Sequence, residues 1–310
     1  MELNKTMNLL AENIVNLSLA DTQRLSLPVL INRDITLDVL RLDKIDPVIS
    51  GNKWFKLKYY FEEALQQNQK RVLTFGGAWS NHIAATACAA KRTGMESIGI
   101  IRGEKPAILS HTLREAAARG MQLVFVSREL YNQKNNPAFI ERLLQEYNNP
   151  CIIPQGGEGK TGIKGASEIL NLTDAGYYTH ILCAVGTGTM LSGIIAGSLP
   201  YQQIIGVPVL KGFDNWLPAG IDEQTKKRVR IETGYHMGGY AKKNNELFDF
   251  MNQFYNETKI PLDFVYTGKL FFSAIDLIKK NYFQNQVRLL TIHSGGLQSN
   301  ESLQSGMLDF

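Results

Sequence analysis

The chain has 310 residues, of which 44% are hydrophobic and 20% charged, and its 33 basic and 29 acidic residues give a net charge of +4. This is the composition of an ordinary soluble protein with a large core, and the charge is too small and too scattered to indicate nucleic-acid binding. Residues 1–25 contain no secretory apolar stretch and no segment approaches about 20 uninterrupted apolar residues, so we expect neither a secretory signal nor a membrane span.

The first predicted elements are two extended runs and a helix. Residues 27–31 and 35–40 are apolar runs of the kind that form strands. From Trp54 to Leu65, apolar residues recur at steps of three and four, which places them on one face of a helix. Asn52 is the expected N-cap of this helix.

Strands and helices alternate along the rest of the chain. Short apolar runs predict strands at residues 71–75, 97–101, 122–126, 151–154, 180–185 and 204–209. The segments between them predict helices at residues 81–91, 109–119, 137–147, 165–172 and 190–197. After the less regular residues 211–245, we predict helices at 244–255 and 270–280 and a last strand at 288–292.

This alternation determines the predicted fold class. Apolar strands that alternate with helices form parallel sheets covered on both faces. The number of strands favours two sheets rather than one. Composition marks no boundary, but the helix after Lys53 and the glycine-rich stretch 156–165 are the best candidates for seams.

The cysteines and histidines indicate no metal site. Cys88, Cys151 and Cys183 lie far apart, each in an apolar run, so we expect them to be buried and reduced in a cytoplasmic protein. His236 and His293 also lack the spacing of metal ligands.

The octet Ser-Gly-Asn-Lys-Trp-Phe-Lys-Leu at residues 50–57 places Lys53 in the first turn of a helix. The helix dipole disfavours a cation there, so the lysine gains little structurally. A lysine with a lowered pKa is, however, a better nucleophile and base. The alternative interpretation is a surface lysine that opens an amphipathic helix.

A glycine-rich turn opens the helix at residue 81. In Gly-Gly-Ala-Trp-Ser-Asn-His, residues 76–82, Ser80 is the expected N-cap, and Gly94 closes the helix. Free backbone N–H groups at such a start suit a carboxylate or a phosphate. The alternative is a capped helix without a ligand.

A second cradle of this kind is Gly186-Thr187-Gly188-Thr189, which lies between a strand and a helix. Its glycines let the backbone approach an anion, and its threonines add hydroxyl donors, so it predicts a phosphate site. It is not a P-loop, because no Lys-Ser/Thr pair follows, and its third glycine is misplaced for a dinucleotide fingerprint.

Two later stretches follow extended runs. They are Val-Tyr-Thr-Gly-Lys at residues 265–269 and His-Ser-Gly-Gly-Leu-Gln at residues 293–298. The carboxyl ends of parallel strands line the ligand crevice of such folds. The alternatives are core packing for Tyr266 and a turn for Ser294. The chain has no G-x-S-x-G elbow, so an α/β-hydrolase serine is not expected.

In this order, the five motifs resemble the 1-aminocyclopropane-1-carboxylate deaminase / D-cysteine desulfhydrase family, from about Leu27 to the C-terminus. These are enzymes of the tryptophan-synthase-β-like fold (PLP fold type II) that depend on pyridoxal 5′-phosphate. The resemblance implies two open twisted mostly parallel α/β domains with the cofactor between them. Residues 1–57 and 159–310 would form the large domain and residues 58–158 the small inserted domain. It also implies a homodimer.

The resemblance implies a role for each matching residue. Lys53 would form the Schiff base with the cofactor and later move the α-proton of the substrate, with Ser80 and Tyr266 as further catalytic residues. The remaining cofactor contacts would come from Asn81 at the ring hydroxyl, from Gly186, Thr187, Gly188 and Thr189 at the phosphate, and from Ser294 at the ring nitrogen. The substrate, a small amino acid, would be held by Ser80, Asn81, His82 and Thr267.

Two departures from the deaminase pattern guide the predicted reaction, and a third, at His82, bears on substrate specificity. Thr267 stands where the deaminases carry glutamate, Ser294 where they carry leucine, and His82 where they carry glutamine. Loss of a carboxylate disfavours the harder opening of a cyclopropane ring. We therefore predict α,β-elimination of D-cysteine to pyruvate, ammonia and sulfide.

Three other functions are weighed against this prediction. One is 1-aminocyclopropane-1-carboxylate deaminase activity. Another is a non-catalytic ligand-binding homologue on the same scaffold, which would have no need of the Lys53 amine. A nicotinamide-dependent dehydrogenase is the third, and it needs an early Gly-x-Gly-x-x-Gly unit that this chain lacks.

Overall fold

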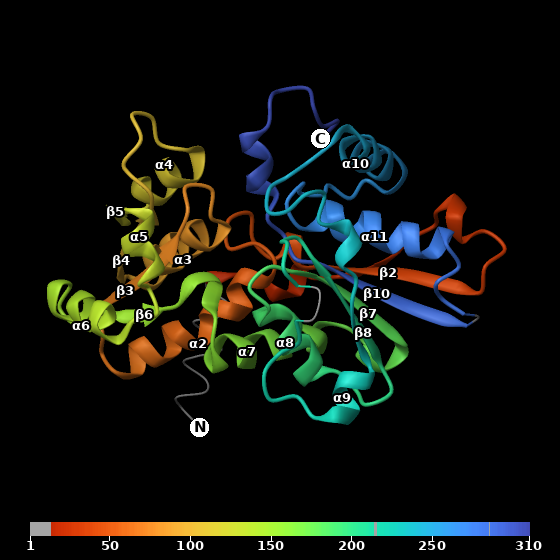
Figure 1. The fold of residues 1–310 in the computed structure, drawn as a ribbon, viewed down its shortest axis with the longest axis horizontal. Coiled ribbons are helices and arrows are strands. Elements are labelled where there is room, and N and C mark those ends of the chain that lie inside the picture. Colours follow the sequence, from red (N-terminus) through yellow and green to blue (C-terminus); the bar gives the residue numbers. More distant parts are fainter. Residues whose placement is uncertain (1–13, 214–215, 285) are drawn as a thin grey trace.

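The computed structural model describes residues 14–213, 216–284 and 286–310. Within them, the chain forms a six-stranded and a four-stranded sheet (Figure 1). The described strands all pair in parallel except β1 and β2, which are antiparallel. The predicted fold class, α/β with mostly parallel sheets, is confirmed.

The larger sheet takes its strands from both ends of the described chain. Its order is β1-β2-β10-β7-β8-β9. The strands are β1 (Thr22–Arg24), β2 (Ile35–Arg41), β10 (Val287–His293), β7 (His180–Val185), β8 (Gln203–Pro208) and β9 (Val229–Ile231). Because β10 pairs with β2 on one side and with β7 on the other, it joins the two distant parts of the sequence.

The smaller sheet comes from one continuous part of the chain. Its order is β5-β4-β3-β6. The strands are β3 (Arg71–Gly76), β4 (Glu96–Arg102), β5 (Gln122–Val126) and β6 (Cys151–Ile153). In Figure 1, it lies on the left, with the larger sheet on the right.

Helices cover both faces of both sheets, as the sequence predicted. The α-helices are α2 (Asn52–Gln66), α3 (Asn81–Thr93), α4 (His111–Ala118), α5 (Arg128–Asn132), α6 (Pro137–Glu146), α7 (Lys160–Ser167), α8 (Thr189–Gly197), α9 (Glu223–Lys227), α10 (Asn245–Thr258) and α11 (Thr267–Lys279). Short 3-10 helices lie at Leu17–Leu19, Pro28–Leu30, Leu42–Lys44, Gln155–Gly157, Glu168–Leu172, Ala175–Tyr177, Thr233–Tyr235 and Leu297–Ser302. Helices α10 and α11 pack on one face of the larger sheet, and α7 and α8 on the other.

Some predicted elements need correction. Residues 27–31 are not a strand: a 3-10 helix spans Pro28–Leu30, because proline fixes a helical φ and has no N–H to pair in a ladder. The helix predicted at 165–172 is α7, which ends at Ser167 and continues as a 3-10 helix. Four elements were not predicted from the sequence, and each is five residues long or shorter: β1, α5, α9 and β9.

Cysteine burial also differs in part from the prediction. The three described cysteines are free, and Cys88 and Cys183 are buried. Cys151 is only partly buried, and its thiol lies 3.6 Å from the backbone oxygen of Tyr60. In the described residues, no group of three or more His, Cys, Asp or Glu side chains is placed to hold a metal ion. Of the helices that the structure describes, none is both long and apolar enough to cross a membrane.

Candidate active site

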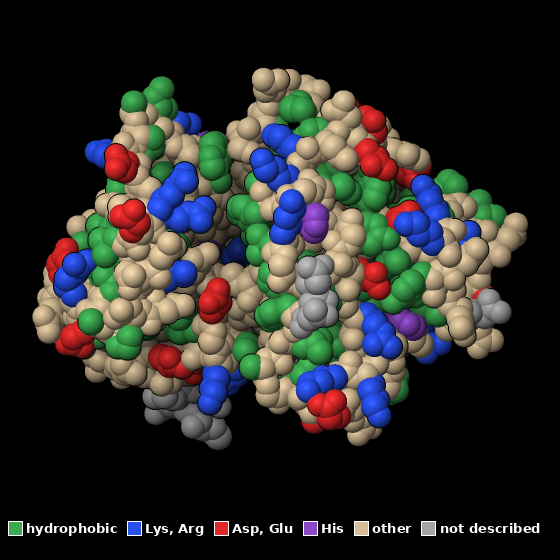
Figure 2. All heavy atoms as spheres, in the orientation of Figure 1, with side chains coloured by type: hydrophobic (Ala, Val, Ile, Leu, Met, Phe, Trp, Pro, Cys, Tyr) green, Lys and Arg blue, Asp and Glu red, His purple; other side chains and the backbone are tan. Residues whose placement is uncertain are grey.

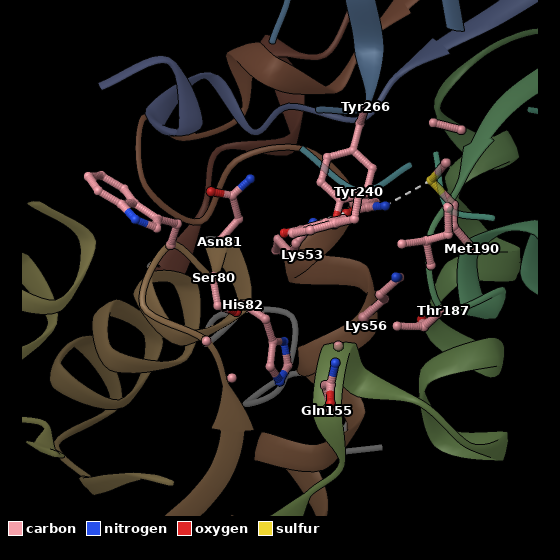
Figure 3. Close-up of a pocket in the computed structure, with 18 of the residues that line it drawn as sticks. Lys53, Lys56, Ser80, Asn81, His82, Gln155, Thr187, Met190, Tyr240 and Tyr266 are labelled. Atoms are coloured by element: carbon pink, nitrogen blue, oxygen red, sulfur yellow. Dashed lines mark hydrogen bonds between the residues drawn. The ribbon is translucent and has the colours of Figure 1, made fainter. Parts of the chain in front are cut away.

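A cavity of about 510 Å³ lies where the carboxyl ends of strands from the two sheets face each other. Figure 2 shows the hollow between the two halves of the molecule, and Figure 3 shows the side chains inside it. The first turns of α2, α3 and α8 all reach this cavity. The sequence-predicted motifs thus converge on one place, as parallel α/β folds arrange their ligand sites.

The Lys53 motif and the Ser294 motif meet at the start of α2. Gly51 is the N-cap with φ of +65°, and a side-chain carbon there would lie 1.8 Å from the backbone oxygen of Ser294. Only glycine permits this contact, through which the N–H of Asn52 donates to that oxygen at 3.2 Å. The prediction of Asn52 as N-cap is wrong, because Gly51 occupies the capping position and Asn52 is the first helical residue.

Lys53 presents its amine to the cavity. Its Nζ donates to Oδ1 of Asn52 at 2.7 Å and lies 5.8 Å from the ring centre of Tyr266 (Figure 3). Burial lowers the pKa of Lys53 to about 8, although the negative charge of Asp263 opposes this shift. The amine therefore has a sizeable neutral, nucleophilic fraction near neutral pH.

Lys56 is a second cavity lysine that the sequence analysis did not select as a site residue. It lies one helical turn after Lys53 on the same face of α2, and only 7% of its surface is exposed. Burial lowers the pKa of Lys56 to about 7, and the neighbouring charge of Lys53 adds to the effect. Its spacing of three residues from Lys53 was the available signal. Figure 3 shows its amine near Thr187.

The start of α3 forms another wall. Ser80 is the N-cap, as predicted, and its hydroxyl oxygen accepts from the N–H of Ile83 at 3.4 Å. Asn81 is buried, and its amide nitrogen donates to the backbone oxygen of Gly296 at 3.4 Å. Its side-chain oxygen has no partner within the described structure. A buried, unpartnered acceptor at a cavity wall suits a ligand that donates a hydrogen bond.

His82 is neutral and fixed in one tautomer. Burial lowers its pKa to about 3, with the charges of Lys53 and Lys56 acting in the same direction. Thr74 donates its single hydroxyl hydrogen to the backbone oxygen of Ile153 at 2.8 Å, so Nε2 of His82 must donate to Thr74 across 2.8 Å. Nδ1 is then an acceptor. The side chain offers no donor to a carboxylate, and only the backbone N–H of His82 remains for that role.

The loop from Gly186 to Thr189 lies opposite, at the start of α8. Gly186, Thr187 and Gly188 line the cavity. Thr189 is 3% exposed, does not line the cavity, and its hydroxyl bonds that of Thr187 at 3.0 Å. The first turn of a helix leaves N–H groups without intrahelical acceptors, so this loop can hold an anion through its backbone.

Tyr266 and Ser294 also line the cavity, the latter only 5% exposed. Burial raises the pKa of Tyr266 well above its usual range, so the phenol keeps its proton. The ring of Tyr240 packs edge-on against it with centroids 6.2 Å apart.

Thr267 does not reach the cavity, contrary to the prediction that it contacts the substrate. It is fully buried and begins α11. Its hydroxyl lies 2.7 Å from Oδ1 of Asp263, and its N–H donates to the same oxygen at 2.8 Å. A carboxylate at a helix start satisfies free N–H groups and is favoured by the dipole, which explains why Thr267 points inward.

This finding revises the argument from the missing carboxylate. Asp263 is fully buried and accepts hydrogen bonds from the N–H groups of Val265, Tyr266 and Thr267. Its Cγ lies 3.6 Å from where a side chain on Gly296 would begin. A carboxylate therefore lies behind the cavity wall, four residues before the position where the sequence lacks one. Sequence reasoning missed it because a lone aspartate in an apolar run resembles a turn residue.

The comparisons with known proteins agree with this geometry. The model of the family described as "Pyridoxal-phosphate dependent enzyme" matches residues 37–295. A putative 1-aminocyclopropane-1-carboxylate deaminase of Pyrococcus horikoshii is 28% identical, covering 86% of this chain and 87% of that protein. A mitochondrial bifunctional D-cysteine desulfhydrase/1-aminocyclopropane-1-carboxylate deaminase of Arabidopsis thaliana is 30% identical, covering 80% and 69%.

A solved structure described as an ACC deaminase homologue has a similar fold. It superposes with a TM-score of 0.74 at 24% identity and covers 95% of both chains. At this coverage, the likeness in fold extends over both sheets.

Proposed function

Because this chain belongs to the family of pyridoxal-phosphate-dependent enzymes, we propose that it eliminates the β-substituent of a small D-amino acid. The preferred substrate in this proposal is D-cysteine, which yields pyruvate, ammonia and sulfide. The observation that carries the proposal is the Lys53 amine, whose pKa burial lowers to about 8 inside a cavity with two free helix starts. The plant relative is named for this activity as well as for the deaminase.

The cavity residues fit the cofactor. Lys53 supplies the amine that its aldehyde requires. The unpartnered oxygen of Asn81 suits the ring hydroxyl, which can donate to it. The N–H groups from Gly186 to Thr189 and the ammonium of Lys56 suit the phosphate, and Ser294 suits the ring nitrogen. When bound, the cofactor supplies an electron sink for the α-carbon of the substrate.

The protein's own residues then hold the substrate and move protons. The backbone N–H groups at the start of α3 and the hydroxyl of Ser80 hold the α-carboxylate. The Nζ of Lys53 takes the α-proton, for which a pKa of about 8 is suitable because a general base works best near the operating pH. Tyr266 keeps its proton and acts as a hydrogen-bond donor.

The deaminase remains a second candidate, and Asp263 is the observation that favours it. A carboxylate near the cavity could assist ring opening. Two facts favour the desulfhydrase instead. Asp263 does not line the cavity, and its oxygens already accept from three backbone N–H groups. The oxygens of Asp263 are therefore already occupied by backbone donors, whereas a thiolate needs little help to leave.

The test compares two reactions on one preparation of holoenzyme. We expect pyruvate and sulfide from D-cysteine, and little or no 2-oxobutyrate from 1-aminocyclopropane-1-carboxylate. Lys53→Ala should abolish both reactions, because Lys53 is the amine to which this proposal assigns the covalent attachment, with Lys56 the other amine in the cavity. Faster 2-oxobutyrate release reverses the assignment. If neither product forms while the cofactor is bound, the non-catalytic homologue becomes the better interpretation.

The proposal includes a homodimer in the cytoplasm. The family resemblance supports the dimer, and three free cysteines are compatible with a reducing compartment.

A further inference from the structure

We propose that the cavity binds a second anionic group of its substrate through Arg102 and Arg128. The preferred substrates are then amino acids with an oxyanion at the far end of the side chain, and D-cysteine shares only their reacting atoms. This inference rests on the proposed function, because it takes the α-carboxylate to lie at the start of α3.

Among the described residues that line the cavity, the charged side chains are Lys53, Lys56, Arg102 and Arg128, and none is a carboxylate. In the proposed reaction, the amine of Lys53 bonds the cofactor aldehyde. The amine of Lys56 lies near Thr187, in the loop from Gly186 to Thr189 that is proposed to bind the phosphate. The α-carboxylate is held by backbone N–H groups. The two arginines therefore have no anion among the groups that the proposed reaction brings into the cavity.

In the part of the chain that the structure describes, neither Arg102 nor Arg128 makes a side-chain hydrogen bond or an ion pair. Other arginines of the chain do pair with carboxylates: Arg24, Arg41, Arg71, Arg92 and Arg119. Figure 2 shows Lys and Arg side chains on both sides of the hollow. Unpaired guanidinium groups at a cavity mouth are suited to bidentate binding of an oxyanion.

Arg102 ends β4, and Arg128 follows β5, while the α3 start follows β3; these three strands are adjacent in the order β5-β4-β3. Neighbouring strands lie about 4.8 Å apart, so the arginines stand roughly 5 and 10 Å along the sheet edge from the α-carboxylate site. Such a span fits the two anionic ends of a short amino acid.

Arg102 is also oriented by its surroundings. Its guanidinium lies 6.0 Å from the ring centre of Tyr131, whose hydroxyl donates to the side chain of Gln155 at 3.0 Å. Across the mouth, its charge opposes the rise that burial causes in the pKa of Tyr240. The side chain therefore lies at the exposed mouth of the cavity, beside the ring of Tyr131.

The test measures binding rather than turnover, with probes whose side chains cannot leave. D-Glutamate and D-glutamine have nearly the same shape and differ in charge, as do D-aspartate and D-asparagine. Each is titrated into the holoenzyme by calorimetry. We expect the better-fitting anionic probe to bind about tenfold more tightly than its amide, an advantage that falls with salt. Arg102→Gln and Arg128→Gln each remove most of this advantage and leave amide binding unchanged.

Arg142→Gln is the matched control, since Arg142 is an exposed arginine stacked on Phe139 of the same domain and does not line the cavity. Equal affinity for acid and amide in the wild type overturns the inference, as does a double variant that weakens both probes alike. D-cysteine turnover on the same preparations separates the two proposals. Normal turnover without charge discrimination leaves only the proposed function standing, and clear discrimination without turnover leaves only the second anion site.

Discussion

At the scale of single residues, burial gives the two cavity lysines their chemistry. Lys53 and Lys56 lie one turn apart on α2, and burial is the main cause of the lowered pKa of each. Asp263 acts in the opposite direction on Lys53, because a negative charge favours the ammonium form. The balance between the apolar surroundings and this one carboxylate sets how much neutral amine is present at a given pH.

This balance predicts a pH dependence for the protein without cofactor. Only the neutral amine reacts with an acylating reagent, so labelling of Lys53, quantified by peptide mass, should be half-maximal near pH 8 rather than near 10.5. Asp263→Asn should move this midpoint to a lower pH, because the charge that stabilises the ammonium is gone.

The matched control is Asp276→Asn, since Asp276 lies on α11 and bonds Tyr235 and Lys280 outside the cavity. It should leave the midpoint where it was. A midpoint near the ordinary lysine value in the wild type, or one that rises in Asp263→Asn, contradicts the account of this site.

Sequence reasoning found the right positions more readily than the right side-chain directions. Lys53, Asn81, Tyr266 and Ser294 all line the cavity, because motifs at strand ends are brought together by the parallel fold. Thr267 was misplaced because its hydroxyl binds the carboxylate of Asp263, which lies four residues earlier and outside α11. Such a choice depends on local packing, which spacing alone does not contain.

At the scale of elements, the loop from Gly186 to Thr189, which we propose binds the cofactor phosphate, depends on a contact behind it. Gly188 is the N-cap of α8 with φ of +87°, and a side-chain carbon there would lie 2.4 Å from the ring of Trp216. The sequence suggests that a side chain at this position blocks the phosphate. In the structure, an added side chain would instead overlap the ring of Trp216. We therefore expect it to displace the whole loop.

Gly188→Val should therefore lower both cofactor retention after dialysis and the melting temperature of the protein without cofactor. The overlap and the left-handed backbone together cost roughly 2–4 kcal/mol. Gly120→Val is the matched control, because Gly120 has φ of +93° but no atom within 4 Å. It should lose stability through backbone strain alone and retain the cofactor. Full cofactor content in the Gly188→Val protein after dialysis would contradict this prediction.

The longer elements were predictable from the sequence, and the short ones were not. Apolar runs such as 180–185 match β7 residue for residue, because a strand buried on both faces must be continuously apolar. Within 211–245, α9 has five residues and β9 has three, too few for a period to emerge. These short pieces are held by tertiary contacts.

At the scale of the whole molecule, we propose a large domain of residues 1–57 and 159–310 and a small domain of residues 58–158. One continuous apolar core crosses this division. It joins Leu57 and Phe61 of α2 to Val72 of the small sheet and to Ile181 of the large sheet. The cavity is therefore formed between halves that share buried side chains rather than between halves connected by a free linker.

The shared core predicts that the two sheets unfold together. In increasing denaturant, hydrogen exchange followed by mass spectrometry should give β4 and β7 peptides the same free energy of opening. Leu57→Ala, at a fully buried site in the shared core, should lower both by about 2–5 kcal/mol.

Leu143→Ala tests whether the two sheets are coupled, because Leu143 packs only in the separate cluster of the small domain. If the halves are coupled, it lowers the β7 value as much as the β4 value. A loss confined to β4 would mean that the small domain opens alone. The cavity would then lose Arg102 and Arg128 before helix α2, which carries Lys53, unfolds.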